Sequence, residues 1–367
     1  MATIKVDLGK NSYEIVVKNG ILKNAGAEIA RACRGRTAVV VTEAGIYELY
    51  GHSLMDSLSS AGFHVFTTMI PGGEDCKVFD TAIELYNRLL GFGIDRSGVL
   101  ITLGGGITGD LGGFAAATYL RGIDFINIPT TLLAQVDASI GGKVGVNLIE
   151  GKNLVGAFHQ PRRVLIDPDL IATLPYPELA SGLAEIIKHG IIADQEMFYF
   201  IRSRTDAIRG MESDTLENVI VRSCEIKADI VSKDEKESGL RAVLNYGHTV
   251  GHGIEAATGY SRYTHGEAVS IGMVTAALIS ETAGLAARGI AEEIAETLQY
   301  FSLPVLLDAD VDLDKVIAAM KYDKKSVSRK LKFILPKRIG KVIITDSVTE
   351  ADIRQAMEKQ AMLFGQD

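Results

Sequence analysis

The sequence predicts an α/β domain followed by an all-α domain. In the first half of the chain, short apolar strand patterns alternate with helical patterns, which is typical of βαβ units and a mainly parallel sheet. The stretch VLITLGGGITGDLGG at residues 99–113 fits a buried strand, a glycine run and a helix start. This arrangement binds a pyrophosphate in Rossmann-like nucleotide-binding domains, although a tight turn that needs glycine for packing is the plainer alternative. Beyond Pro177 strand patterns nearly vanish, so we expect domains at 1–177 and 178–367.

Alternating apolar and polar residues predict a hairpin from residues 4–8 and 13–17 at the start of the first domain. Helical spacing of apolar residues follows at 21–33, 44–60 and 78–90. Short buried strands are expected at 37–42, 63–70, 99–103, 124–128 and 163–167. The segment PTTLLAQVDASIGGKVGVN (129–147) is rich in small and hydroxyl residues, so we expect a functional loop there instead of a core element.

The second domain is predicted to be helical and to hold the more informative histidines. The expected helices are 178–192, 195–204, 213–234, 241–257, 267–287, 290–301 and 350–363, with a small hairpin from 331–335 and 341–345. A cleft between the two domains would be a preferred place for a ligand.

Composition and charge exclude several classes of protein. A net charge of −8 argues against nucleic-acid binding, which usually needs a basic field. The longest apolar stretch, 268–279, is shorter than the roughly 20 residues that span a bilayer, and the N-terminus lacks the apolar block of a signal peptide. Three scattered cysteines without a CxxC pair fit a reducing compartment. We therefore expect a soluble, cytoplasmic protein that binds neither nucleic acid nor membranes.

Histidines and one glutamate form a candidate metal site in the second domain. His248 and His252 are four residues apart and share one face of a predicted helix, which makes them the obvious pair from spacing alone. His265 precedes the next helix, and Glu185 lies one turn before Lys188. A glutamate with two histidines is a common ligand set for a catalytic Zn²⁺. The alternative is that these are ordinary surface or core histidines.

Charged residues in predicted loops and helix starts form candidate binding groups. Against an acidic chain, a set of cations would make a local positive pocket for an anionic substrate: Lys143, Lys152, Lys188, Lys227, Arg241 and Lys324. Each of them also fits a solvated surface charge. Asp110, Asp137 and Glu74 follow predicted strands, where acids can hold cofactor hydroxyls, although Asp110 fits a helix N-cap and Asp137 a turn equally well.

In combination, these motifs resemble the 3-dehydroquinate synthase family, NAD- and zinc-dependent cyclases of aromatic biosynthesis within the sugar-phosphate cyclase superfamily. The resemblance covers most of the chain from Pro71 to Met273, in family order. The segments that carry it are GGGITGDLGGFAAATYLRG, IPTTLLAQVDASIGGKVGVN, GKNLVGAFHQP, LAEIIKHG, LRAVLNYGHTVGHGIE and HGEAVSIGM. It implies a dehydroquinate synthase-like fold, with an N-terminal NAD-binding domain and a C-terminal helical domain that holds the metal.

The resemblance also implies site residues. Carried over from the family motifs, the ligands of Zn²⁺ or Co²⁺ would be Glu185, His248 and His265, which overrules the pair suggested by spacing. NAD contacts would come from Glu74, Lys77, Gly105, Asp110, Thr130, Thr131 and Lys152. Substrate contacts would come from Asp137, Lys143, Asn153, Lys188, Lys227, Arg241, Asn245 and His252. Lys324, or its neighbour Lys325, would close on the phosphate, and Arg121 would reach into a neighbouring subunit's site, which implies a homodimer.

At one position the chain departs from the family pattern. After the strand ending in Thr42 the family usually has an aspartate for the adenosine ribose, whereas this chain has Glu43. An acid at this place favours NAD over NADP because it would repel a 2′-phosphate.

The implied substrate is 3-deoxy-D-arabino-heptulosonate 7-phosphate, whose two anionic ends account for the cations. The implied reaction is a transient oxidation by NAD, elimination of phosphate, re-reduction and intramolecular aldol closure to 3-dehydroquinate. The alternatives are another sugar-phosphate cyclase, a metal-dependent alcohol or glycerol dehydrogenase of similar fold, and a non-catalytic nucleotide-binding module. The clustered cations argue against a dehydrogenase, which would need no phosphate pocket. A non-catalytic binding module should lack at least one metal ligand, whereas all three are present in this sequence.

Overall fold

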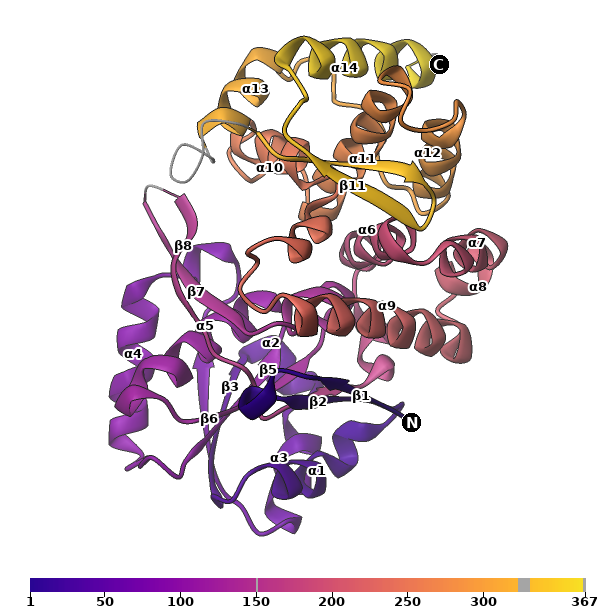
Figure 1. The fold of residues 1–367 in the computed structure, drawn as a ribbon. Coiled ribbons are helices and arrows are strands. Elements are labelled where there is room, and N and C mark those ends of the chain that lie inside the picture. Colours follow the sequence, from indigo (N-terminus) through magenta and orange to yellow (C-terminus); the bar gives the residue numbers. More distant parts are fainter. Residues whose placement is uncertain (150, 323–330, 366–367) are drawn as a thin grey trace. The chain divides into compact units, whose positions relative to one another are not determined.

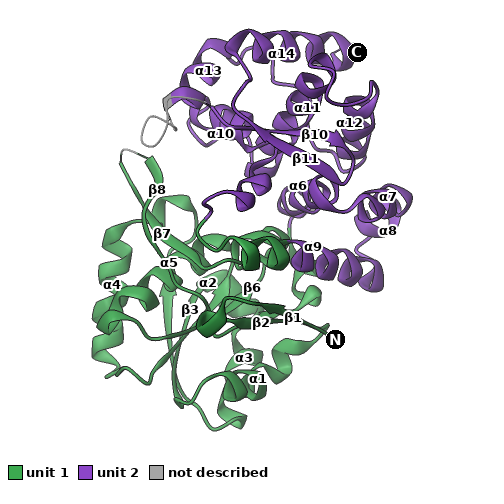
Figure 2. Cartoon of the chain, viewed as in Figure 1, with its two compact units in different colours: residues 1–174, 227–236 green, residues 175–226, 237–367 purple. Residues whose placement is uncertain are grey.

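The computed structural model describes residues 1–149, 151–322 and 331–365 (Figure 1). Lys324 and Lys325, the two candidates for a phosphate contact, lie outside the described residues. The chain forms two compact units: unit 1 comprises residues 1–174 and 227–236, and unit 2 comprises residues 175–226 and 237–367 (Figure 2). Helix α9 (Ser213–Lys233) contributes its first part to unit 2 and its last turns to unit 1.

Unit 1 is built on a twisted sheet that is parallel except at one edge. Over the described residues its seven strands lie in the order β1-β2-β9-β6-β5-β3-β4, and only the β1–β2 hairpin is antiparallel. The strands are β1 (Ala2–Val6), β2 (Tyr13–Val17), β3 (Thr37–Glu43), β4 (His64–Ile70), β5 (Val99–Gly104), β6 (Asp124–Pro129) and β9 (Arg163–Ile166). Residues 99–104 are all buried because β5 lies in the middle of the sheet with helices over both faces.

Two apolar clusters fill the two faces of this sheet. On one face, α1 (Ala25–Ala32) and α3 (His52–Ser60) bury Ile29, Leu54 and Leu58 against the strands. On the other face, α4 (Phe79–Gly91) and α5 (Gly106–Thr118) bury Leu85, Leu89 and Leu111. The α/β fold class predicted from the alternating patterns is therefore confirmed for the first part of the chain.

The segment after β6 differs from the loop that its composition suggests. It contains a π-helical turn, η6 (Ala134–Ala138), and then a hairpin of β7 (Lys143–Leu148) and β8 (Gly151–Phe158). Val144 and Val146 of β7 are buried in the cluster formed by α4 and α5. Glycines obscure this strand in the sequence, yet Gly145 is needed there because a Cβ would lie 2.6 Å from the Val155 carbonyl oxygen.

Unit 2 is an assembly of helices around the almost fully buried α11 (His265–Thr282). Helices α6, α10, α12 and α14 all pack against α11. The bounds of the other elements are α6 (Tyr176–Ala193), α7 (Gln195–Ser203), α8 (Thr205–Arg209), α10 (His248–Ala257), α12 (Ile290–Tyr300), α13 (Leu313–Tyr322), α14 (Glu350–Phe364), β10 (Phe333–Arg338) and β11 (Lys341–Thr345). No described helix is both long and apolar enough to cross a membrane.

The continuous helix expected at 241–257 is interrupted just before the first histidine. A 3-10 turn, η8 (Leu240–Asn245), precedes α10, and Gly247 between them has a left-handed φ of 80°. The remaining short elements are η1 (Gly9–Asn11), η2 (Ile21–Asn24), α2 (Ala44–Ile46), η3 (Tyr47–Gly51), η4 (Glu74–Cys76), η5 (Tyr119–Arg121) and η7 (Pro168–Thr173). Because of this break, His248 begins a new helix instead of lying within a longer one.

Candidate nucleotide and metal sites

The carboxyl ends of β3, β5 and β6 gather several predicted cofactor residues at one edge of the sheet. From β3 the chain first adds β4 on one side and then β5, β6 and β9 on the other, so β3 and β5 flank the topological switch point. Ligands of open α/β sheets bind at such a point. Glu43 ends β3, Gly105 follows β5, and Thr130 and Thr131 follow β6.

Glu43 is held at this switch point. Thr108 Oγ1 on α5 donates to Glu43 Oε1 at 2.8 Å, and a Cβ on Gly72 would lie 2.7 Å from Glu43 Oε2. Thr130 Oγ1 is buried and has no hydrogen-bond partner among the described residues. A fixed carboxylate, an unsatisfied hydroxyl and the free N-terminus of α5 at Gly105 are the groups that a dinucleotide would use. This edge of unit 1 therefore fits NAD.

A second cluster in unit 1 joins four predicted NAD residues to one predicted substrate residue. Lys77 Nζ is buried and donates to Asp110 Oδ2 at 2.6 Å and to Asn153 Oδ1 at 2.5 Å. Lys152 Nζ lies 3.7 Å from Glu74 Oε1. Burial raises the pKa of the Asp110 carboxyl, and the Lys77 ammonium opposes that rise. Lys77 thus neutralises Asp110 and orients the side chain of Asn153.

Asn147 belongs to this cluster, although the sequence interpretation did not include it. Its amide donates to Glu74 Oε1 at 2.7 Å, and its Oδ1 accepts from the Asn153 backbone at 2.9 Å. Asn153 has a φ of 56°, a conformation that asparagine tolerates better than most residues. The two asparagines lie on either side of the β7–β8 turn. If the pairing of these strands had been predicted, Asn147 would have been expected near Asn153.

Asp137 and Lys227 are a pair within unit 1. Lys227 Nζ donates to the Asp137 carboxylate at 2.5 Å and to its backbone carbonyl at 2.7 Å. Asp137 lies in the π-helical turn η6, and such turns are frequent at functional sites. Lys227 comes from the part of α9 that belongs to unit 1, so residues 90 apart in sequence meet here.

In unit 2, three side chains converge as a candidate metal centre. One ligand atom from each of Glu185, His248 and His265 lies within 4.8 Å of the other two. His248 Nε2 is 3.5 Å and His265 Nε2 is 3.7 Å from Glu185 Oε1. That oxygen is buried and accepts no hydrogen bond from any described residue. A buried, unsatisfied carboxylate oxygen facing two imidazole nitrogens fits a divalent cation.

The electrostatics of this cluster favour the forms that bind metal. Lys188 Nζ donates to Glu185 Oε2, and both side chains are buried. Burial, together with the nearby Lys188 cation, lowers the pKa of His248 well below its usual range. Its imidazole is therefore neutral near pH 7, and Nδ1 lies 3.1 Å from the Tyr246 carbonyl oxygen. A proton on Nδ1 leaves the Nε2 lone pair available for a metal.

Small residues bring the three helices close enough for their ligands to meet. A Cβ on Gly272 of α11 would lie 2.0 Å from the Gly247 carbonyl oxygen, which immediately precedes α10. A Cβ on Gly266 of α11 would lie 2.4 Å from Ser181 Cα on α6, one turn before Glu185. Thr264 caps α11 through a capping box, which fixes His265 as the first helical residue.

The other residues predicted to contact substrate are distributed over both units. In unit 2, Arg241 is buried, His252 is exposed, and the two rings of His252 and His248 lie 5.3 Å apart. Asn245 Nδ2 donates to Glu237 Oε1 at 2.7 Å. The sequence interpretation missed Glu237 because the run DEKES is typical of a solvated loop. In unit 1, Lys143 and Arg121 are exposed.

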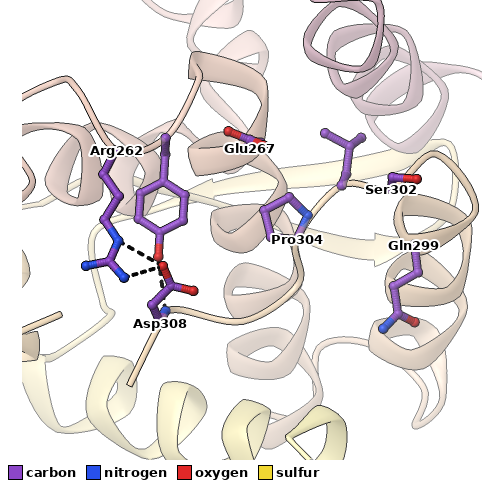
Figure 3. Close-up of a pocket in the computed structure, with 8 residues that line it drawn as sticks. Arg262, Glu267, Gln299, Ser302, Pro304 and Asp308 are labelled. Atoms are coloured by element: carbon purple, nitrogen blue, oxygen red, sulfur yellow. Dashed lines mark hydrogen bonds and ion pairs between the residues drawn. The ribbon is translucent and has the colours of Figure 1, made fainter. Parts of the chain in front are cut away.

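A pocket of about 490 Å³ also lies in unit 2 (Figure 3). Its lining contains none of the predicted site residues, and its main charge is satisfied, since Arg262 pairs with Asp308 and Asp310. Glu267 at its edge belongs to the capping box of α11. These charged lining groups thus have structural roles, and the cluster of Glu185, His248 and His265 remains the candidate metal centre.

Comparison with known families agrees with this geometry. The profile of the 3-dehydroquinate synthase N-terminal domain matches residues 67–181, and that of the C-terminal domain matches residues 182–326. The chain belongs to the 3-dehydroquinate synthase family. Curated 3-dehydroquinate synthases are 44% identical in Microcystis aeruginosa (96% of this chain, 97% of the relative) and 45% in Nostoc punctiforme (97% and 98%). The chain is therefore an enzyme of this type.

Solved structures place it in the same fold. A 2-epi-5-epi-valiolone synthase from Streptomyces hygroscopicus, with NAD⁺ and Zn²⁺ bound, matches with a TM-score of 0.88 at 29% identity, covering 95% of this chain and 97% of that one. A 2-deoxy-scyllo-inosose synthase complexed with carbaglucose-6-phosphate, NAD⁺ and Co²⁺ matches with a TM-score of 0.89 at 25% identity, covering 98% of this chain and 100% of that one. A probable glycerol dehydrogenase from Sinorhizobium meliloti shares the fold alone. Its TM-score is 0.65 at 17% identity, covering 95% of this chain and 96% of that one.

Proposed function

We propose that this chain converts 3-deoxy-D-arabino-heptulosonate 7-phosphate to 3-dehydroquinate and phosphate, a step of the shikimate pathway. The observation that carries the proposal is the convergence of Glu185, His248 and His265 in a chain similar to 3-dehydroquinate synthases over nearly its whole length. We assign NAD binding to unit 1 and metal binding to unit 2. The cofactors are NAD and a divalent metal, Zn²⁺ or Co²⁺, as the sugar-phosphate cyclases of known structure hold them.

When bound, NAD would supply an acceptor that takes up a hydride and returns it within one turnover, and the metal would supply a Lewis acid for the oxygen of the carbon that is oxidised. Glu43 would accept hydrogen bonds from the ribose hydroxyls, and the N-terminus of α5 at Gly105 would hold the pyrophosphate. The other proposed NAD contacts are Glu74, Lys77, Asp110, Thr130, Thr131 and Lys152.

The chain's cations bind and orient the substrate. Lys143, Lys188, Lys227 and Arg241 supply positive charge for the carboxylate and phosphate. Asp137, Asn153 and Asn245 hold hydroxyl groups, and His252 takes part in phosphate binding or proton transfer. Lys188 already orients Glu185 through Oε2, which keeps Oε1 toward the histidines. Holding one flexible anion in one geometry is a large contribution to the rate.

We also propose a cytoplasmic homodimer in which Arg121 reaches the partner's site. Arg121 is exposed and has a left-handed φ of 69° at the end of η5, the 3-10 turn that follows α5. The β7–β8 hairpin exposes Leu148, Leu154 and Phe158, an apolar surface typical of an interface. The three cysteines are buried free thiols, as expected in a reducing compartment.

The deciding assay combines the protein with the heptulosonate phosphate, Zn²⁺ and NAD in less than stoichiometric amount. We expect phosphate and dehydroquinate to appear together through many turnovers without net NADH. Net NADH would instead indicate a dehydrogenase, and turnover of sedoheptulose 7-phosphate or glucose 6-phosphate in its place would indicate another cyclase.

A variant links this activity to the proposed metal centre. His265→Ala should lose most bound metal and nearly all turnover because one of three protein ligands is gone. His52→Ala, which removes an exposed histidine on α3 of unit 1, is the matched control and should keep both. Full activity of His265→Ala without metal would contradict the assignment.

A further inference from the structure

We propose that Glu255 is a positioning residue for the metal centre, acting through His265. Its carboxylate accepts a hydrogen bond from Nδ1–H of His265, which leaves the Nε2 lone pair free to bind the metal. The inference rests on the proposed function, in which His265 is a ligand. Neither the motifs nor the comparisons give Glu255 a role.

The geometry connects the two residues directly. Glu255 lies on α10 seven residues after His248, so two helical turns separate them and both face the same side. Both carboxylate oxygens of Glu255 lie 3.4 Å from His265 Nδ1. The side chain of Glu255 is 12% exposed, so solvent screens this contact only weakly. Through this contact α10, which already supplies His248, also orients the ligand that begins α11.

The two histidines are held in the same way by different partners. His248 has Nδ1 against the Tyr246 carbonyl oxygen and Nε2 toward Glu185 Oε1. His265 has Nδ1 against Glu255 and Nε2 toward the same Glu185 oxygen. In a neutral imidazole only one nitrogen carries a proton, and an acceptor at Nδ1 selects the tautomer that leaves Nε2 free. Both rings are therefore preset for one metal position.

The partner of His265 differs from that of His248 in charge. A carboxylate acceptor makes the imidazole a more basic ligand than a neutral carbonyl does. Glu255 also adds a second negative charge beside a cluster in which Lys188 already offsets Glu185. Removal of Glu255 should therefore weaken metal binding in two ways, through lost orientation and through lost charge.

A competing role for Glu255 is direct ligation of a second cation. Ligand atoms of His252, Glu255 and His265 also lie within 4.8 Å of one another. The two roles exclude each other at His265, because a neutral imidazole that donates its Nδ1 proton to Glu255 has no lone pair there for a metal. The number of ions bound per chain separates them.

The test measures metal affinity of the full chain without NAD or substrate. Metal-free protein, Glu255→Gln and Glu255→Ala are titrated with Zn²⁺ against a chromophoric chelator, and with Co²⁺ while its visible absorption is recorded. We expect one ion per chain, and an affinity that is about 10- to 100-fold weaker in Glu255→Ala. The affinity of Glu255→Gln should fall between, because its amide oxygen still accepts a hydrogen bond from Nδ1–H but carries no charge. Its Co²⁺ absorption bands should lie at the same wavelengths as those of the unsubstituted protein.

Glu358→Gln is the matched control, since Glu358 is an exposed glutamate on α14, and its affinity should equal that of the unsubstituted protein. Unchanged affinity in both Glu255 variants would overturn the proposal. The proposal would also be overturned if the unsubstituted chain bound two ions and Glu255→Ala bound one, because Glu255 would then ligate a second ion directly. If Glu255→Ala fails to fold, Glu255→Gln alone decides. A chain that binds metal as predicted but forms no dehydroquinate would contradict the proposed function and leave this inference supported.

Discussion

Glu185 shows how one residue serves two partners in these sites. Its Oε2 accepts from Lys188, while its Oε1 faces His248 and His265 without a hydrogen bond from the described residues. Spacing alone favours His248 with His252, because they share a helix face. In the structure His252 is exposed, and Glu185 gathers with His248 and His265. The periodicity of a helix shows which residues share a face, but it does not show which of them contacts a carboxylate from another helix.

Glu43 is the residue at which cofactor choice can be tested. In Glu43→Gln the side chain keeps its length but loses the negative charge. That charge would strengthen hydrogen bonds from the ribose hydroxyls and repel a 2′-phosphate. A hydrogen bond to a charged group contributes about 1.5–3 kcal/mol, so NAD affinity should fall about tenfold or more while NADP affinity rises relative to it.

Both affinities are measured by calorimetric titration of the two nucleotides. Glu48→Gln on η3 is the control, since Glu48 is exposed, and it should change neither affinity. Equal losses of NAD and NADP affinity in Glu43→Gln would show that Glu43 does not face the ribose.

At the scale of elements, glycine contacts decide where the candidate metal ligands meet. α10 and α11 approach so closely at Gly272 and Gly247 that neither helix tolerates a side chain between them. His248 and His265 are the first residues of these two helices, so a shift of either helix would move a candidate ligand. Helical periodicity predicts each helix separately, but it does not show this contact.

Gly272→Ala should therefore damage the metal site without touching a ligand. The added Cβ would lie 2.0 Å from the Gly247 carbonyl oxygen, and overpacking of this kind costs about 1–3 kcal/mol of unfolding free energy. We expect a lower denaturation midpoint and weaker Zn²⁺ affinity. Gly91→Ala at the end of α4 is the control, because a Cβ there meets nothing within 4 Å. Loss of stability with unchanged metal affinity would show that the contact does not position the ligands.

At the scale of the whole molecule, the chain divides its chemistry between two units. The predicted NAD residues lie in unit 1 and the predicted metal ligands in unit 2. Helix α9 belongs to both, since Lys227 from its last turns pairs with Asp137 of unit 1. The sequence predicts a single domain boundary near Pro177. It does not show that residues 227–236 belong to the first unit.

The proposed homodimer is tested at the β7–β8 hairpin. Leu154 on β8 is 61% exposed, and within the described residues β8 pairs only with β7, which leaves its outer edge open. Leu154→Glu should convert the dimer to monomers at micromolar concentration and leave the far-UV spectrum unchanged, as measured by sedimentation equilibrium. Met362→Glu on α14, which changes another exposed apolar residue, should stay dimeric. A Leu154→Glu dimer of undiminished stability would place the interface elsewhere.

The sequence by itself determined the fold class, most of its helices and strands, and the family. These follow from local pattern and motif: apolar runs at strand or helix spacing, and glycines where a strand meets a helix. Only the tertiary structure decided which polar groups share a site. It paired Lys77 with Asp110, Lys227 with Asp137 and Glu255 with His265, and it revealed the β7–β8 hairpin. The reason is physical, since such contacts depend on how closely separate elements pack, which local periodicity does not encode.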